Sequence, residues 1–347
     1  MSLRTILCAA IVCCSPFAVA QSPAPPPSAS PAATQAVIDA LAPADIEEAV
    51  RALKSNFIDP NALKDEEITK ATLQGLLARL RGGVVLLAGK ATEETAAPLY
   101  SDVLANHIGY LRLGSVTKEN LAELDKALAN FATKKVDAVV LDLRASAGNT
   151  EFDVAAEVAE RFVPKGKTMW TLHKNSARED QTFSSDRDPV FQGITIGLID
   201  SETSGAAEAI ATALKVKPQT LLIGEPTAGR AVEYSDFPLS GGKILRVAVG
   251  EVRVPAGQSL FPGGVKPDLP VELAPDQKRR IFVASAQKGM APFVFEPERP
   301  HFNEAALIAG TNPELDARRR ASDDNPRDAV LQRAVDVITS LAVFQKH

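Results

Sequence analysis

The sequence predicts an α/β protein with a largely parallel sheet, a small N-terminal helical hairpin and a C-terminal helical arm. Between residues 108 and 224, apolar strand patterns alternate with amphipathic helical patterns, which is typical of right-handed β-α-β crossovers. Helical patterns also precede and follow this region. With 347 residues and 45% hydrophobic content, the chain can bury a sizeable core.

The first segment, residues 1–20, has the features of a secretory signal peptide. Arg4 precedes an apolar run, and Ala18 and Ala20 are the small residues typical of a cleavage site. The apolar run, residues 6–12, is much shorter than the ~20 residues that a membrane-spanning helix needs. We therefore expect an exported product, periplasmic or secreted, without stable membrane insertion.

The composition argues against several classes of protein. All three cysteines lie within the first segment, so the mature chain would have neither disulfides nor thiolate metal sites. The four histidines show no ligand spacing, and we expect neither a metal nor another cofactor. Acidic residues outnumber basic ones, 43 to 38, and the basic run at 317–321 is flanked by aspartates, which argues against a nucleic acid partner.

Two helical patterns follow a linker. Residues 21–44 are rich in Pro, Ala and Ser and are predicted to be extended. In the N-terminal helical segment, residues 45–87, the first helix begins at Asp45, the N-cap of a capping box, and the second spans residues 65–81 and ends at two glycines. The first helix has one apolar face (Ile46, Ala49, Val50, Leu53, Phe57), and the second is expected to bury Ile68, Leu73, Leu76, Leu77 and Leu80.

The core is predicted to span residues 105–273. Strand patterns occupy residues 108–113, 136–143, 168–172, 194–200 and 219–224, and helical patterns occupy residues 117–133, 151–163 and 204–217. The β-rich run at 232–254, with a turn at 240–242, indicates a hairpin. Asp142 and Arg144, which flank Leu143, form either a functional pair or a structural one that pairs with neighbours at the carboxyl edge of the sheet, and we favour the structural role. The C-terminal arm, residues 274–347, ends in a helix at 326–345.

Six segments carry motifs in a fixed order. They are FIDPNALKDEEITKATLQGLL (57–77), IGYLRL (108–113), VVLDLRASAGNTEFDVAAEVAERFVPKG (139–166), GLIDSETSGAAEAIATAL (197–214), LLIGEPTAGR (221–230) and FPGGVKPDLPVEL (261–273). In this order they resemble the tail-specific, or C-terminal-processing, serine peptidase family, which implies its Clp-protease/crotonase-like core. Many members insert a PDZ domain before that core, but the about twenty residues between Leu87 and Ile108 are too few for an independent domain of ~50 residues.

The resemblance implies a chemistry based on a serine nucleophile and a lysine general base. The serine position, three residues before a glutamate, is matched here by Gly205, which has no side chain. The lysine position is matched by Arg230, and an arginine side chain cannot serve as a general base because it is not deprotonated in proteins. A third polar position, usually Gln, falls at Tyr234. The chain therefore resembles a peptidase that lacks both reacting groups.

The neighbouring residues leave alternatives open. Ser204 is either an alternative nucleophile or the N-cap of the next helix, accepting a backbone N–H near Ala207, and we favour the cap. Ala147, Gly148 and Asn149 match the family's Gly-rich turn, whose N–H groups hold an oxyanion. That turn either keeps the shape of this cradle or only starts the following helix.

Three functions are compatible with these residues. The favoured one is a degenerate peptidase that binds a polypeptide or peptide terminus, added to a sheet edge, with Arg230 pairing a carboxylate. The second is an active serine endopeptidase that uses Ser204 and an unidentified base. The third is a structural subunit whose cleft is filled, with Arg230 buried against Glu208 or Glu233. The sequence leaves the oligomeric state open.

Overall fold

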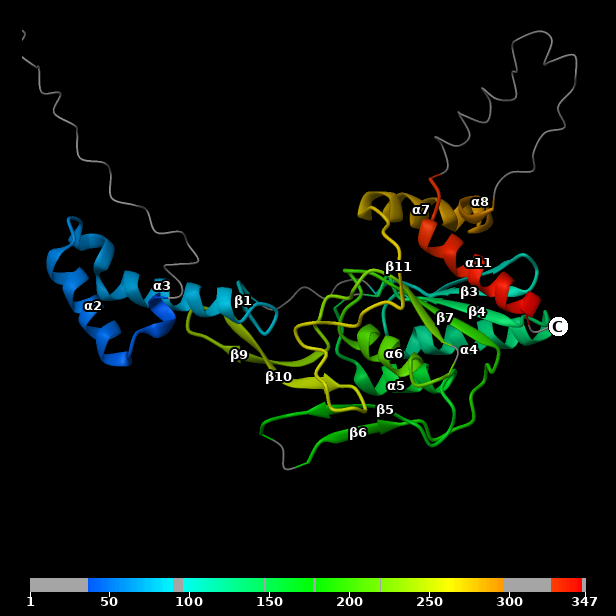
Figure 1. Cartoon of the computed structure of the whole chain (residues 1–347), viewed down its shortest axis with the longest axis horizontal. Helices are drawn as coiled ribbons and strands as arrows, with labels where there is room; N and C mark the ends of the chain where they lie inside the picture. The colour runs from blue at the N-terminus through cyan, green and yellow to red at the C-terminus, as the bar shows by residue number, and fades with distance from the viewer. Residues whose placement is uncertain are drawn as a thin grey trace, which may run out of the picture. The chain divides into compact units, whose positions relative to one another are not determined.

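The computed structural model describes residues 37–89, 96–146, 148–176, 179–218, 220–295 and 326–344 (Figure 1). The predicted signal peptide, most of the predicted linker and the basic run at 317–321 lie outside these ranges. The chain divides into two compact units, Met1–Gln74 and Gly75–His347. Within the described ranges, no helix has both the length and the apolar character needed to cross a membrane.

The N-terminal helices form as predicted. They are α2 (Pro43–Asn56), the short 3-10 helix η1 (Pro60–Leu63) and α3 (Asp65–Arg79). The prediction that Asp45 is an N-cap is wrong, because α2 starts earlier, at Pro43, whose missing N–H is harmless in the first turn. Asp45 lies inside the helix, and its carboxylate accepts a hydrogen bond from the N–H of Ala42 at 3.0 Å.

The apolar side chains of these helices stay exposed, and the prediction of a buried face on α3 is wrong. None of the described side chains of α2 or α3 is buried. Leu53 is 52% exposed and Leu76 is 50% exposed. An amphipathic face is buried only against a second packed layer, and the helical pair does not supply one by itself.

The larger sheet of the second unit has six strands within the described residues, in the order β11-β8-β7-β4-β3-β2. The β2–β3 pair is antiparallel and the other pairs are parallel, which confirms the predicted largely parallel sheet. The strands are β2 (Tyr100–Leu104), β3 (Ile108–Arg112), β4 (Ala138–Asp142), β7 (Ile194–Ile199), β8 (Leu221–Gly224) and β11 (Leu269–Pro270). The predicted helices between them are α4 (Lys118–Thr133), α5 (Phe152–Glu160) and α6 (Ala206–Leu214).

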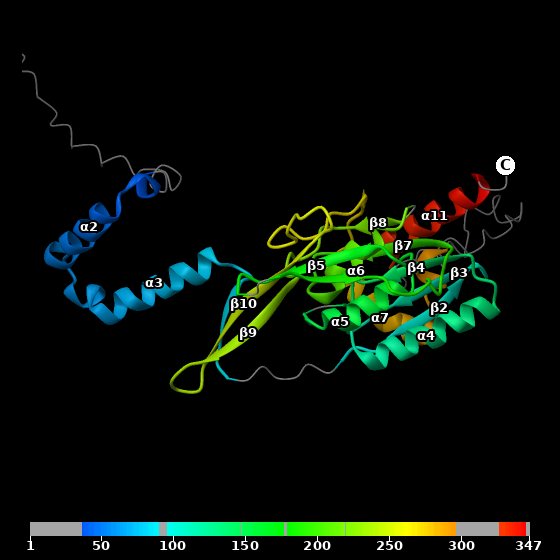
Figure 2. The same ribbon diagram turned by 90° about the horizontal axis from the view of Figure 1, so that it is seen from below.

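The second sheet is antiparallel and has five strands in the part of the chain that the structure describes. They are β1 (Val84–Leu87), β5 (Thr168–His173), β6 (Gln181–Ser184), β9 (Val232–Pro238) and β10 (Ile244–Arg253). The predicted hairpin is confirmed, and Figure 2 shows β9 and β10 running side by side. The predicted strand at 168–172 forms β5, but its place in the parallel alternation is wrong, because it pairs with β6 and with the distant β10.

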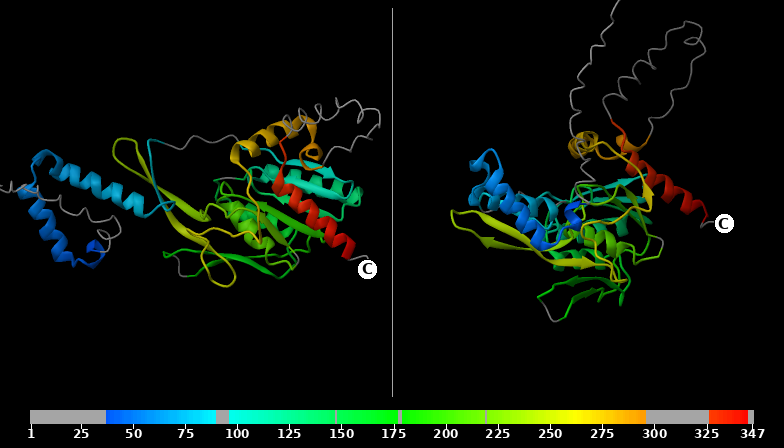
Figure 3. Two further views of the ribbon diagram at one scale, coloured as in Figure 1. Left: turned by 45° about the horizontal axis from the view of Figure 1, so that its top comes forward. Right: turned by 60° about the vertical axis from the view of Figure 1, so that its left-hand side comes forward.

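Helices cover both faces of the parallel sheet. Leu141 of β4 lies in the core shared with α4, α5 and α6. Val140, the next residue back, lies in the core shared with α7 (Pro275–Lys288), α8 (Ala291–Val294) and α11 (Ala329–Phe344). This two-sided burial explains the nearly continuous apolar run of β4. The C-terminal arm is thus a second layer on the sheet, as Figures 1 and 3 show.

Candidate functional site

The loop from β7 to α6 carries Gly205, at the position where the resembled family has its serine. Gly205 is the N-cap of α6, with φ 64° and ψ −126°. Residues other than glycine rarely adopt this backbone conformation, because their Cβ meets the backbone. A Cβ at this position would stand 2.1 Å from the carbonyl oxygen of Asn149. The N–H of Ala206 donates to the same oxygen at 2.8 Å. The backbone of Asn149 therefore occupies the space that a side chain at position 205 would need.

A buried glutamate, Glu208, joins the two motifs. Its Oε2 accepts hydrogen bonds from the backbone N–H groups of Gly205 at 3.0 Å and Arg230 at 2.7 Å. Its Oε1 accepts from the N–H of Gly229 at 2.7 Å and from the Thr227 hydroxyl at 2.5 Å. Burial raises the pKa of Glu208, while these four donors act in the opposite direction. One carboxylate thus brings the positions matching the family's serine and lysine together.

The prediction that Ser204 caps α6 is wrong. The Ser204 Oγ accepts a hydrogen bond from the N–H of Gly148 at 2.8 Å, and Gly205 holds the N-cap position. The backbone N–H of Ser204 donates to the carbonyl of Ser146 at 3.3 Å. The loop therefore turns Ser204 toward the turn at 146–149 instead of toward the first turn of the helix.

Among the described residues, no group accepts a hydrogen bond from the Ser204 hydroxyl. None of them is therefore placed to act as a general base for Ser204. Two threonine hydroxyls of the site do have acceptors. Thr203 donates to the backbone carbonyl of Leu143 at 3.2 Å, and Thr227 donates to Glu208. Thr203 is fully buried, whereas Thr227 is about as buried as Ser204, at 7% and 6% exposed.

The backbone N–H groups beside position 205 are engaged within the chain. The N–H of Gly148, which has φ 75°, is bound to the Ser204 hydroxyl. The N–H of Ala206 is bound to the Asn149 carbonyl. Ala147, the third residue of the predicted cradle, lies outside the described residues. An oxyanion cradle requires donors aimed at an open position, and in this conformation both donors already have internal acceptors.

Arg230 and Tyr234 differ in exposure. Arg230 is exposed, so its predicted burial in a filled cleft does not occur. Tyr234 is half-buried, and its hydroxyl donates to the carbonyl of Gly82 at 2.6 Å. Burial raises the pKa of the Tyr234 phenol. Glu233 forms an ion pair with Lys174, at 2.7 Å.

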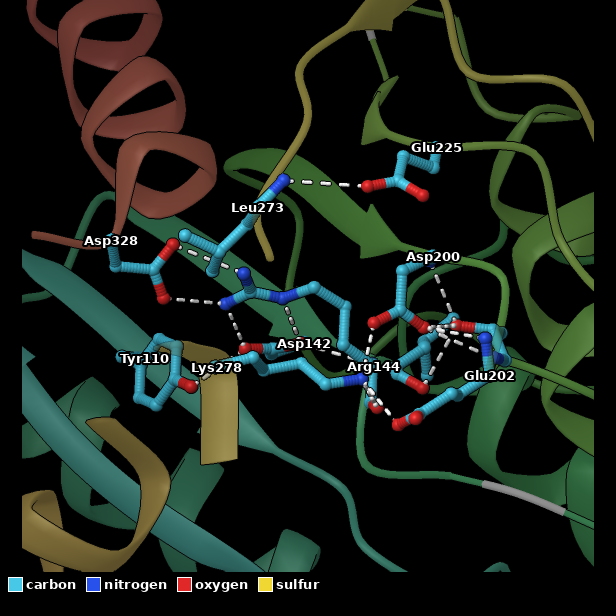
Figure 4. Close-up of polar contacts among 11 residues, drawn as sticks. Tyr110, Asp142, Arg144, Asp200, Glu202, Glu225, Leu273, Lys278 and Asp328 are labelled. Carbon is cyan, nitrogen blue, oxygen red and sulfur yellow. Dashed lines mark hydrogen bonds and ion pairs between the residues drawn. The ribbon is translucent and has the colours of Figure 1, made fainter. Parts of the chain in front are cut away.

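The predicted structural pair at the carboxyl edge of the sheet is confirmed (Figure 4). Arg144 donates through Nε to Asp142 Oδ1 at 2.9 Å and through Nη2 to Oδ2 at 2.6 Å. Its Nη1 and Nη2 also donate to both carboxylate oxygens of Asp328, at 3.0 and 2.8 Å. Tyr110 donates its hydroxyl to Asp142 at 2.7 Å. All four side chains are buried, so the pair is part of a closed polar network.

The structure brings most of the predicted site residues together. Gly148, Asn149, Ser204 and Gly205 are linked by direct contacts, and Arg230 joins them through Glu208. The sequence pattern locates the serine position from Glu208 and offers Glu208 as a partner for a buried Arg230, but it does not reveal that the Glu208 carboxylate is the common acceptor. Glu208 is the third residue of α6, and a glutamate at this position typically accepts a hydrogen bond from the backbone N–H of the N-cap residue. This position is the sequence signal for the contact with Gly205. Among the described residues, no group of three or more His, Cys, Asp or Glu side chains could hold a metal ion.

Known proteins with similar sequences are proteases. The model of peptidase family S41 matches residues 107–271. The carboxy-terminal processing protease CtpA of Bacillus subtilis is 26% identical over 212 residues, 61% of this chain and 44% of that protein. The chloroplastic carboxyl-terminal-processing peptidase 2 of Arabidopsis thaliana is 30% identical over 165 residues, 47% of this chain and 32% of that protein. The chain spans less than half of the length of these relatives.

A solved structure supports the fold. The crystal structure of a protein from Parabacteroides merdae, described as a candidate peptidase, has a TM-score of 0.51 and 17% identity, covering 72% of this chain and 98% of that one. The expected peptidase-type α/β core, of the Clp-protease/crotonase-like kind, is confirmed. Residues 107–271 thus match the model of peptidase family S41, and the relatives named above are carboxyl-terminal-processing proteases, which supports the predicted resemblance to the tail-specific peptidase family.

Proposed function

We propose that this chain is an exported, degenerate member of its peptidase family that binds a polypeptide without cleaving it. The observation that carries the proposal is the state of position 205. Gly205 offers no attacking oxygen, and the carbonyl of Asn149 lies 2.1 Å from where a Cβ would stand. Without a nucleophile, no acyl intermediate forms.

The proposed loss of activity has a second, independent support at Arg230. Arginine side chains are not deprotonated in proteins, so Arg230 accepts no proton from an attacking group. Its backbone N–H is held by Glu208 at 2.7 Å while its side chain extends into solvent. Such an exposed guanidinium is suited to a bidentate contact with a carboxylate.

The proposed binding surface lies beside Arg230. Strand β9 begins two residues later and pairs with β10 along one edge. Within the described residues no strand pairs with its other edge. An extended peptide can add to such an edge through main-chain hydrogen bonds, while Arg230 binds its terminal carboxylate. Export is supported by the first segment of the sequence, whose basic residue, apolar run and small residues match a secretory signal peptide.

The test is a calorimetric titration of the purified protein with extended peptides, each with a free or an amidated C-terminus. We expect binding of the free-carboxyl peptides, and a loss of about tenfold in affinity, which equals 1.4 kcal/mol, for Arg230→Gln. Arg280→Gln, which removes an exposed guanidinium from α7, is the matched control and should bind as the wild type does. No measurable affinity for any peptide terminus would contradict the proposal.

An active endopeptidase that uses Ser204 is the second proposal, and the names of the relatives favour it, because they are proteases. Its weakness is the Ser204 hydroxyl, which accepts a hydrogen bond from Gly148 and lacks an acceptor for its proton in the described part of the chain. A fluorophosphonate probe separates the two proposals. Labelling at Ser204 that disappears in Ser204→Ala would support the enzyme, and an unlabelled protein supports the binding role.

A further inference from the structure

One side chain of the C-terminal arm, Lys278 of α7, reaches the candidate site from the opposite layer of the sheet. Its ammonium lies at the ends of two neighbouring strands (Figure 4). It forms ion pairs with Asp200 and with Glu202, the latter at 2.6 Å, and it donates to the backbone carbonyl of Arg144 at 3.1 Å. Lys278 is only 4% exposed, so its ammonium is shielded from solvent, whereas the Glu202 side chain is 48% exposed.

Asp200 transmits this contact to the loop that carries Ser204 and Gly205. While Oδ2 of Asp200 binds Lys278, its Oδ1 accepts hydrogen bonds from the backbone N–H groups of Glu202 at 3.0 Å and Thr203 at 3.1 Å. The carboxylate therefore shapes the first turn of the loop. The Lys278 ammonium therefore binds two carboxylates of the loop, those of Asp200 and Glu202.

The C-terminal arm also contacts Arg144, which lies near the residues that face Ser204. The Arg144 carbonyl that accepts from Lys278 lies two residues before Ser146, whose carbonyl accepts from the N–H of Ser204. The guanidinium of Arg144 is held by Asp328, which also accepts a hydrogen bond from the N–H of Leu331 in α11 at 3.0 Å. Thus Lys278 of α7 and Asp328, which directly precedes α11, both bind Arg144.

The charges in this contact make Lys278 hard to replace. The ammonium faces two carboxylates, those of Asp200 and Glu202. A neutral side chain at position 278 would leave these acidic groups side by side without a cation, and like charges that share a site repel each other. The loop can relieve that repulsion by moving Glu202, which is half exposed, outward into water.

We propose that Lys278 is a positioning residue, which holds the loop 200–205 in the conformation that sets Ser204 against Ser146 and Gly148 and sets Gly205 beside Asn149. Lys278 acts through Asp200 and Glu202 and touches neither Ser204 nor Gly205. The C-terminal arm then controls the geometry of the site, and a partner or modification that lifts α7 loosens it. The inference concerns the loop itself, and only its binding readout rests on the proposed function.

Hydrogen exchange of the full chain tests this inference directly. In Lys278→Met, we expect the amides of residues 203–206 to exchange about tenfold faster or more, while the amides of β4 change less than about twofold. Lys278→Arg, which keeps the charge, should restore much of the protection. Arg280→Met removes an exposed charge from the same helix and should leave the loop unchanged.

Glu202→Gln is the second variant, chosen because its side chain is 48% exposed and its replacement leaves no buried charge alone. It should speed exchange in the loop about threefold and leave β4 unchanged. Unchanged loop exchange in both variants, or equal acceleration in the loop and in β4, would overturn the inference. Peptide titration reads out the proposed function separately: if wild-type protein binds no peptide, that function fails while the exchange result still decides the role of Lys278.

Discussion

Introducing a serine at position 205 should fail to produce catalysis and should destabilise the protein. In Gly205→Ser, the backbone at φ 64° and ψ −126° would have to hold a side chain in a region that is nearly specific for glycine, which costs about 1–3 kcal/mol. The new Cβ would also meet the Asn149 oxygen at 2.1 Å. Relief of that clash requires this oxygen to move by roughly 1 Å, toward an ordinary carbon–oxygen separation.

The movement has its own energetic consequence. It breaks or weakens the hydrogen bond that the Asn149 carbonyl accepts from Ala206, worth about 0.5–1.5 kcal/mol. Together the two effects lower the free energy of unfolding by about 1.5–4.5 kcal/mol, or about 3–18 °C in Tm. Catalysis would still be absent, because Arg230 cannot serve as a base and the neighbouring N–H groups are engaged.

Urea unfolding of three variants provides the assay. Gly205→Ala shares the clash, whereas Gly148→Ala is the matched control, with φ 75° but no atom within 4 Å of its Cβ. The control should lose only about 1–2 kcal/mol from the left-handed backbone. The reasoning is refuted if Gly205→Ser unfolds like the wild type, if both alanine variants lose the same amount, or if Gly205→Ser cleaves a polypeptide.

Other predictions concern the buried network and the two units. Arg144→Met leaves two buried carboxylates unpaired and should lower the free energy of unfolding by about 3–5 kcal/mol in urea; an unchanged midpoint would argue against this. Burial alone would raise the pKa of Asp142, but Arg144 and the hydrogen bonds hold it below its ordinary value of about 4. Stability should therefore fall as the pH drops below about 4, and Asp142→Asn should flatten this acid limb in a pH series of urea curves. Glu208→Gln places an amide nitrogen against N–H donors and should lose about 1–3 kcal/mol, measured in the same way. Leu53→Ala on exposed α2 should change stability by less than about 0.5 kcal/mol, whereas Leu141→Ala in β4 should lose about 2–5 kcal/mol by thermal unfolding; similar losses would contradict the burial difference.

The sequence pattern predicted the parallel core because its strands are buried on both faces. Leu141 and Val140 point into different cores, so the segment reads as a continuous apolar run with a strong signal. The place of β5 was beyond such reasoning, because its partner β10 comes from a distant part of the chain and the pattern of a strand does not encode its partner. Likewise, amphipathic spacing identified α3 but did not reveal that its apolar face remains uncovered.

In the candidate site, too, local sequence patterns predicted some features, whereas contacts between distant residues could not be predicted. Local motifs located Gly205, three residues before Glu208, and Arg230, directly after Gly229, because both positions are read from short spacings in the sequence. The hydrogen bond between Ser204 and Gly148 joins residues far apart in sequence, so the helix-cap rule predicted a local partner instead. Lys278 and Asp328 were missed for the same reason, because their partners belong to strands and loops of the core.

The central claim is that a site does not cut peptide bonds when position 205 has no attacking oxygen and position 230 has no group that can accept a proton. The most direct test incubates the protein, purified without residues 1–20, with an unfolded polypeptide and follows new termini by mass spectrometry, beside Ser204→Ala. The account predicts an intact polypeptide with both proteins. Cleavage by the wild type that disappears in Ser204→Ala would contradict it.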